Sequence, residues 1–128
     1  MAWSLPALLL LLCSLGVSQA LLRVYNLRAD GLNADPTTPA DCYVKLFYDS
    51  KGMGMTSFKV DTNSPWWDDE FAYPGAEQGS ILRVEAWDKD LIYDDKLGSC
   101  QFLLRLGTWI AKCHLAEGGT LYFNYTLS

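Results

Sequence analysis

The sequence predicts an all-β sandwich that follows a short leader segment. Short runs rich in Val, Leu, Tyr and Phe recur along the chain, and this composition is typical of β-strands. Turn-forming Gly, Pro, Asn, Asp and Ser residues separate the runs. Regular short strands bounded by turns indicate an all-β sandwich. The predicted strands span residues 21–27, 42–48, 56–60, 71–73, 81–87, 96–106 and 120–127.

The segments between these runs justify the strand boundaries in order. They contain the residues that turns prefer, and they cover residues 30–31, 34–41, 50–54, 63–69, 73–80 and 117–119. Alternation is clearest in the run 81–87, where Leu82, Val84 and Ala86 fall on one face and Arg83 falls on the other. This period of two is expected of a half-buried strand.

Two further local expectations complete the element assignment. The segment "GTWIAKCHL" at 107–115 could form a helical turn. The tryptophans that follow the leader are expected in the core, and they are Trp66, Trp67, Trp87 and Trp109.

Residues 1–20 are predicted to be a secretory signal peptide. The stretch "LPALLLLLCSLGVSQA" carries no charge, is too short to span a bilayer, and ends in small residues at Ser18 and Ala20. Cleavage after Ala20 leaves residues 21–128 as a single domain. We therefore expect a secreted, extracellular protein in which the leader runs directly into the sandwich.

The charge balance excludes some functions. The formal net charge is -5 and the sequence has no Lys/Arg cluster, so nucleic acid is not expected as a partner. An enzyme such as a lipase is not expected either. The sequence lacks the Gly-x-Ser-x-Gly pattern, and its single histidine, His114, has no evident nucleophile beside it.

The cysteines predict one disulfide in the mature chain. Of the four cysteines, Cys13 leaves with the leader. Cys100 and Cys113 flank a short segment and are expected to pair in an oxidising compartment. For Cys42 two alternatives stay open: a buried, inert thiol, or a site of intermolecular pairing that would give a dimer rather than the expected monomer.

Two acidic loops predict a calcium site. In "WDKDLIYDDKLGSC" (87–100), Asp88, Asp90, Asp94 and Asp95 cannot lie together ionised without a cation or ample water. Ligands that are all oxygen suit Ca²⁺, although the spacing differs from that of the helix-loop-helix calcium loop. A second loop supports this hypothesis, with acidic side chains at its two ends, Asp35 and Asp41.

The segments "NLRADGL", "ADPTTPADCYVKLF", "TNSPWWDDEF" and "LRVEAWDKDLIYDDKLGSC" together resemble the C2 domain family, and within it the C-terminal C2 domain of perforin. The resemblance covers nearly all of residues 22–125. It implies an antiparallel, eight-stranded Greek-key β-sandwich with calcium-binding loops at one end. The sequence departs from perforin in one respect, because perforin's C2 domain follows a large pore-forming domain, and here we expect a secreted, stand-alone domain.

The resemblance also implies a set of calcium ligands. The first-loop ligands fall on Asp35 and Asp41, and the third-loop ligands fall on Asp88 and Asp90. The last ligand falls on Asp95, and Asp94 is an alternative for that position because this loop is one residue shorter than in many relatives.

We therefore expect a calcium-dependent module that binds phospholipid membranes in innate immune defence, at microbial or damaged-cell surfaces. The apolar triplet Leu91, Ile92 and Tyr93 is expected to contact the membrane. The alternative hypothesis is a calcium-stabilised interaction protein that binds a protein or glycan partner. Asn124 begins a glycosylation sequon, Asn-Tyr-Thr, and is a candidate for modification.

Overall fold

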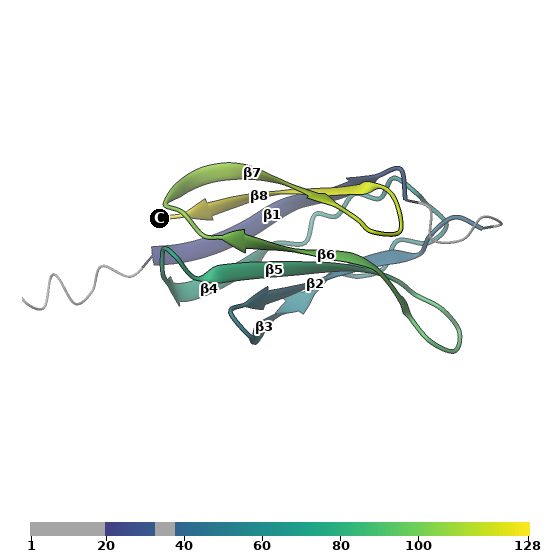
Figure 1. Ribbon diagram of the computed structural model, residues 1–128, viewed down its shortest axis with the longest axis horizontal. Helices are drawn as coiled ribbons and strands as arrows, with labels where there is room; N and C mark the ends of the chain where they lie inside the picture. The colour runs from purple at the N-terminus through teal and green to yellow at the C-terminus, as the bar shows by residue number, and fades with distance from the viewer. Residues whose placement is uncertain (1–19, 33–37) are drawn as a thin grey trace, which may run out of the picture.

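The computed structural model describes residues 20–32 and 38–128, and within them the chain forms eight strands (Figure 1). The strands are β1 (Ala20–Asp30), β2 (Cys42–Tyr48), β3 (Lys51–Met55), β4 (Phe71–Ala76), β5 (Ile81–Asp88), β6 (Asp95–Leu103), β7 (Gly107–His114) and β8 (Thr120–Leu127). They build two antiparallel sheets, in the orders β4-β1-β8-β7 and β3-β2-β5-β6. The predicted all-β sandwich is confirmed.

The core lies between the two sheets and follows the period of two. In β8, Leu121, Phe123, Tyr125 and Leu127 are buried, while the residues between them are half-buried. Trp67 is fully buried, and its indole Nε1 donates a hydrogen bond to the carbonyl of Ser57 at 2.8 Å. Among the described residues, no helix is long and apolar enough to cross a membrane.

Three local predictions were wrong. Residues 50–54 were expected to be a turn, yet Lys51–Met55 form β3 at the edge of a sheet, while 56–60 contribute only an isolated bridge between Lys59 and Cys42. The segment 107–115 contains β7 rather than a helical turn. Trp66 is 55% exposed and Trp87 is half-buried outside the core, where both were expected to lie.

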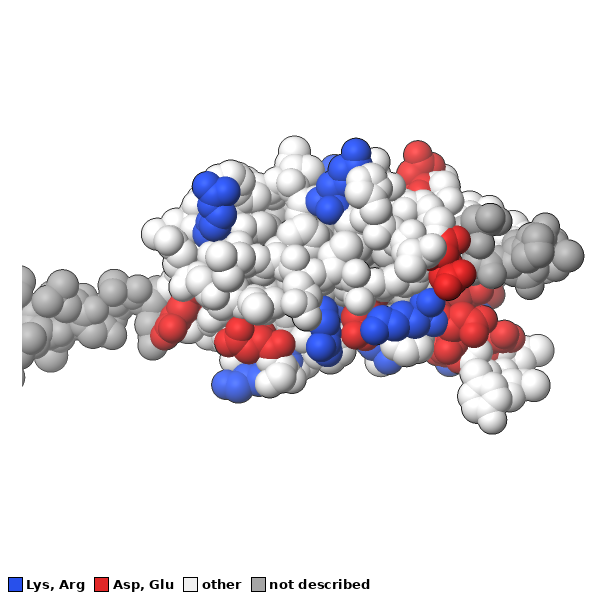
Figure 2. Space-filling model, viewed as in Figure 1, with Lys and Arg blue, Asp and Glu red and all other residues white. Residues whose placement is uncertain are grey.

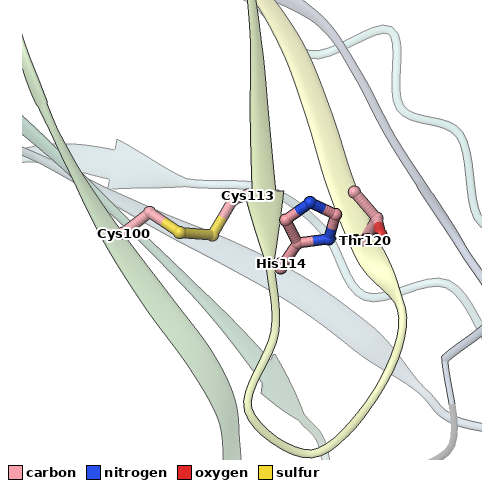
Figure 3. The surroundings of a disulfide bond; sticks show 4 residues. All are labelled: Cys100, Cys113, His114 and Thr120. Carbon is pink, nitrogen blue, oxygen red and sulfur yellow. Dashed lines mark hydrogen bonds between the residues drawn. A yellow bond between two sulfur atoms is a disulfide. The ribbon is translucent and has the colours of Figure 1, made fainter.

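The predicted disulfide is confirmed and joins the two sheets. Cys100 on β6 is bonded to Cys113 on β7, with the two Cα atoms 5.8 Å apart (Figure 3). Because β6 and β7 are edge strands of different sheets, the bond ties one edge of the sandwich together. In the same view, the neighbouring His114 lies beside Thr120, with 3.4 Å between Nδ1 and Oγ1.

Candidate calcium site

The strand register brings three of the predicted aspartates to one end of the sandwich. Asp88 is the last residue of β5, a central strand, and it pairs with Cys42 on β2 and with Asp95 on β6. The residue before β2 is Asp41, whose backbone N–H donates to Asp88 Oδ1 at 2.8 Å. The ladder of β2, β5 and β6 therefore places Asp41 and Asp95 on either side of Asp88.

The carboxylate of Asp88 lies in an unfavourable electrostatic environment. Burial raises its pKa first, and the negative charges of Asp41, Asp95 and Asp90 raise it further, against the opposing effect of the hydrogen bond from Asp41. Such repulsion at one strand end is what a bound cation would relieve. A flexible shell of oxygen ligands suits calcium.

Two of these carboxylates also fix the surrounding loops. Asp41 Oδ1 accepts a hydrogen bond from the backbone N–H of Asp61 at 2.6 Å, which ties the connection before β4 to this end. Asp90 Oδ1 accepts from the N–H of Leu91 at 2.6 Å. One oxygen of each carboxylate is thus already used by the backbone.

Asp94 has different partners from the other acids. Its Oδ2 accepts a hydrogen bond from the Tyr43 hydroxyl at 2.6 Å and lies 3.8 Å from Lys89 Nζ, while its Oδ1 accepts from the Asp90 N–H at 3.1 Å. The Tyr43 bond, followed by the Asp90 N–H and then the charges of Lys89 and Lys45, holds the pKa of Asp94 below its usual range. Burial and the bond to Asp94 raise the pKa of Tyr43 to about 12.

Asp94 therefore faces a cavity beside the strand ends rather than Asp88. The cavity has a volume of about 330 Å³. Its walls are Tyr43, Lys45, Met55, Thr56, Ser57, Phe58, Lys89 and Asp94. Sequence reasoning missed Tyr43, because the contact joins residues 51 positions apart and no local pattern signals it.

The expected first-loop ligand Asp35 lies outside the described residues. Among residues 20–32 and 38–128, no three His, Cys, Asp or Glu side chains are grouped so that they could hold a metal ion. The oxygen donors and the repulsion around Asp88 fit calcium chemistry, while the full set of ligands stays a prediction.

The apolar triplet projects from this end into solvent. Leu91, Ile92 and Tyr93 are 100%, 82% and 79% exposed. They lie in the loop between β5 and β6, which extends away from the sandwich in Figure 1. Figure 2 shows Asp and Glu side chains crowded at the base of an uncharged projection. Within the part of the chain that the structure describes, the triplet therefore does not pack on a neighbouring loop.

Cys42 and Asn124 are both placed by the structure. Cys42 is buried, its sulfur donates towards the carbonyl of Tyr43 at 3.8 Å, and burial followed by the charge of Asp88 raises its pKa to about 12. This favours the inert thiol over an intermolecular bond. Asn124 lies half-buried on β8, where its Oδ1 accepts from Asn26 and from Arg28, and its glycosylation stays a prediction.

The family model for the C2 domain matches residues 20–117, and the chain belongs to the C2 domain family. It is similar to perforin-1 of Mus musculus, with 35% identity over 98 residues that cover 74% of this chain and 18% of that protein. It is also 35% identical to perforin-1 of Homo sapiens over 109 residues, 83% of this chain and 19% of that protein. The chain thus spans about a fifth of the length of these relatives.

Solved structures agree with this family. A structure of a C2 domain superposes with a TM-score of 0.82 at 45% identity, covering 85% of this chain and 98% of that one. The calcium-bound C2A and C2B domains of extended-synaptotagmin 2 share the fold, with a TM-score of 0.71 at 20% identity over 85% of this chain and 45% of theirs. The C2 domain that the family model matches is a non-enzymatic module.

Proposed function

We propose that this chain is a secreted, calcium-dependent module that binds phospholipid membranes in host defence. Membership of the C2 family and the similarity to perforin-1 support a membrane-binding role. The disulfide between Cys100 and Cys113 supports an oxidising, extracellular location. The defence role rests on the similarity to perforin-1 alone.

One observation carries the proposal: a fully exposed apolar tip stands on a base of mutually repelling carboxylates. Without a cation, Asp41, Asp88 and Asp95 repel an anionic lipid surface, and the tip formed by Leu91 and its neighbours stays in water. When bound, calcium neutralises these carboxylates and offers open coordination positions to lipid phosphate oxygens. The aspartates then decide whether the tip can approach a membrane.

The energies explain why both parts are needed. Burying three such side chains contributes at most roughly 5 to 9 kcal/mol, and the cost of association is of the same order. An apolar tip of this size alone therefore gives marginal membrane binding, like a single short acyl chain. Attraction between lipid phosphates and the calcium held by the aspartates supplies the remaining free energy of binding. It also makes membrane binding depend on calcium.

We assign Asp35, Asp41, Asp88, Asp90 and Asp95 as the calcium ligands. Asp94 is better suited to a positioning role, because its two oxygens are engaged by Tyr43, Lys89 and the Asp90 N–H. The bond between Asp94 and the Asp90 N–H spans the base of the tip. Asp94 thereby holds the loop in the conformation that presents the tip.

The proposal is tested by replacing the apolar tip. Leu91→Ser with Tyr93→Ser should lower affinity for anionic liposomes in calcium at least about tenfold, because apolar burial at the membrane is lost. Calcium affinity without lipid should stay unchanged. Co-sedimentation measures the affinity for liposomes, and calorimetric titration measures the affinity for calcium.

Leu103→Ser with Leu106→Ser is the matched control, since these residues are 64% and 57% exposed and lie at or just after the far end of β6. Liposome binding should survive in this control. Equal binding by the tip variant and the parent protein would contradict insertion of the tip.

A further inference from the structure

The outer face of the sheet β4-β1-β8-β7 gathers cationic, aromatic and amide side chains. The register lines them up in three rows across β7, β8 and β1. The rows are Lys112–Tyr122–Arg28, Ile110–Asn124–Tyr25 and Thr108–Thr126–Arg23. Alternation along β8 turns these side chains away from the core, so that they form one continuous surface.

The first row leaves two cations without a carboxylate partner. Arg28 and Lys112 flank the ring of Tyr122, with 5.5 Å from the guanidinium carbon and 5.9 Å from Nζ to the ring centre. Neither forms an ion pair within the part of the chain that the structure describes, whereas Arg23 pairs with Glu70 at 3.0 Å. The two cations thus add two positive charges to this face of a chain with net charge -5. The next row, His114–Thr120–Asp30, adds one carboxylate, which accepts a hydrogen bond from the Ser64 hydroxyl at 2.9 Å. Figure 2 shows Lys and Arg side chains along the upper margin, where Figure 1 draws β7, and an acidic side chain towards the right of the same margin.

A hydrogen-bonded network fixes the orientation of these groups. Asn26 occupies the irregularity in β1 with a φ of 56°, a left-handed conformation that costs energy in a non-glycine residue. Its Nδ2 donates to Asn124 Oδ1 at 3.2 Å, and its Oδ1 accepts from Trp66 Nε1 at 3.2 Å. Arg28 donates to Asn124 Oδ1 at 3.2 Å and to the Asn26 carbonyl at 2.7 Å.

The network leaves two kinds of binding group available. The Trp66 ring is 55% exposed and lies beside Arg28, to which its backbone is bridged. Exposed aromatic rings provide flat apolar faces, while guanidinium groups bind sulfate or carboxylate through paired N–H donors. This combination suits an anionic saccharide, because an exposed aromatic ring stacks on a sugar ring and the neighbouring cations bind its acidic groups.

We propose that this face is a second binding site, separate from the calcium end, for an anionic saccharide. Arg28 and Lys112 bind its sulfate or carboxylate groups, and the exposed ring of Trp66 stacks on a sugar ring. A second copy of the chain is a poorer occupant, because identical cationic faces repel each other. Nucleic acid needs a denser positive footprint than two unpaired cations.

The experiment measures binding of the protein to heparin oligosaccharide and, separately, to polysialic acid. These probes distinguish sulfate from carboxylate as the recognised group. All measurements are made in chelator without lipid, so that failure of the calcium-dependent function does not affect them. The protein is produced in the bacterial periplasm, which forms disulfides but adds no N-glycan at Asn124.

The parent protein should bind at least one probe, and its affinity should fall as salt is raised. Arg28→Gln with Lys112→Gln should lower affinity about tenfold or more, since two charge-assisted contacts are lost. Lys112→Gln alone should lower it about threefold with an unchanged melting temperature, because this side chain forms no hydrogen bond with the described residues. Lys51→Gln with Lys59→Gln is the control of equal charge, and it should bind like the parent.

Three results would overturn the proposal. The first is that neither probe binds. The second is that the Lys51 and Lys59 control loses as much saccharide affinity as the Arg28 and Lys112 variant. The third is that a single-stranded oligonucleotide binds more tightly than both saccharides. If the Arg28 variant melts early, Lys112→Gln and Trp66→Ser decide the outcome, because both side chains are exposed.

Discussion

Neighbouring aspartates have opposite environments at the calcium end. Asp88 is partly buried beside other carboxylates, and its pKa is raised. Asp94 accepts hydrogen bonds from Tyr43 and the Asp90 N–H, and its pKa is lowered. A ligand that awaits a cation is expected to have the first environment, whereas a carboxylate that already has partners has the second. The sequence presents both as acids in one loop.

The raised pKa of Asp88 predicts a stability effect that reverses with calcium. In the calcium-free protein, ionised Asp88 destabilises the fold, and this cost grows as pH rises from the usual Asp pKa through the raised one and is fully present at neutral pH. Asp88→Asn should therefore raise the free energy of unfolding in chelator at neutral pH, by less than about 1 kcal/mol because solvent screens this carboxylate.

The same variant should lose stabilisation by calcium, which ligand linkage puts at roughly 1.4 kcal/mol when calcium is about ten times the dissociation constant. Thermal melts in chelator check the expected gain in stability, and melts in calcium check the expected loss of stabilisation by calcium. Asp68→Asn is the matched control, because residues 68–69 lie away from the strand ends that carry the calcium site. They run beside the middle of β1, between the Trp67–Leu27 hydrogen bond and the Phe71–Val24 pair. A full calcium shift in Asp88→Asn would place the ion elsewhere.

Tyr43 gives a test of the positioning role of Asp94. Tyr43→Phe removes the hydroxyl that donates to Asp94 but keeps the ring. Calcium affinity without lipid should change less than about twofold, while liposome affinity in calcium should fall about threefold as the tip loses its support. An equal loss of both affinities would instead indicate that Asp94 is a calcium ligand.

At the scale of the elements, strand register rather than sequence proximity builds each site. Asp41 and Asp88 meet because β2 pairs with β5, and Arg28 meets Lys112 because both β1 and β7 pair with β8. The sequence contains no Lys/Arg cluster, and only the sheet creates one. The pairing of the strands is therefore as important to each site as the residues on the strands.

The disulfide should stabilise the sandwich chiefly by joining two of its edge strands, β6 and β7. Cys100→Ser with Cys113→Ser opens a loop of sequence separation 13, and should lower the free energy of unfolding by about 2 to 4 kcal/mol. Urea unfolding of the variant and the parent measures the difference. Calcium affinity of the folded variant should stay the same, because β5 ends away from this bond. A loss below about 0.5 kcal/mol would show that the two sheets hold together without it.

At the scale of the whole molecule, the sequence predicted the fold class, the disulfide and the exposed tip, and missed elements whose pattern is weak. Gly52 and Gly54 made β3 resemble a turn, because glycine is depleted in strands. In β7 two of the three inward residues, Ala111 and Cys113, are small, while the larger Ile110 points outward and obscures the alternation.

Contacts between distant segments could not be predicted in this way. The Tyr43–Asp94 bond and the rows around Tyr122 depend on which strands are neighbours and in which register. The sequence alone indicates the chemical character of a loop, and the partners of each side chain follow only from the assembled sheets.

The central claim is that calcium switches membrane binding on, and co-sedimentation with liposomes tests it most directly. The protein is mixed with vesicles of zwitterionic and anionic phospholipids, in about 10⁻³ M calcium and again in chelator. We predict that it sediments with the vesicles in calcium and stays in the supernatant in chelator. Equal sedimentation in the two conditions, or none in calcium, would contradict the account.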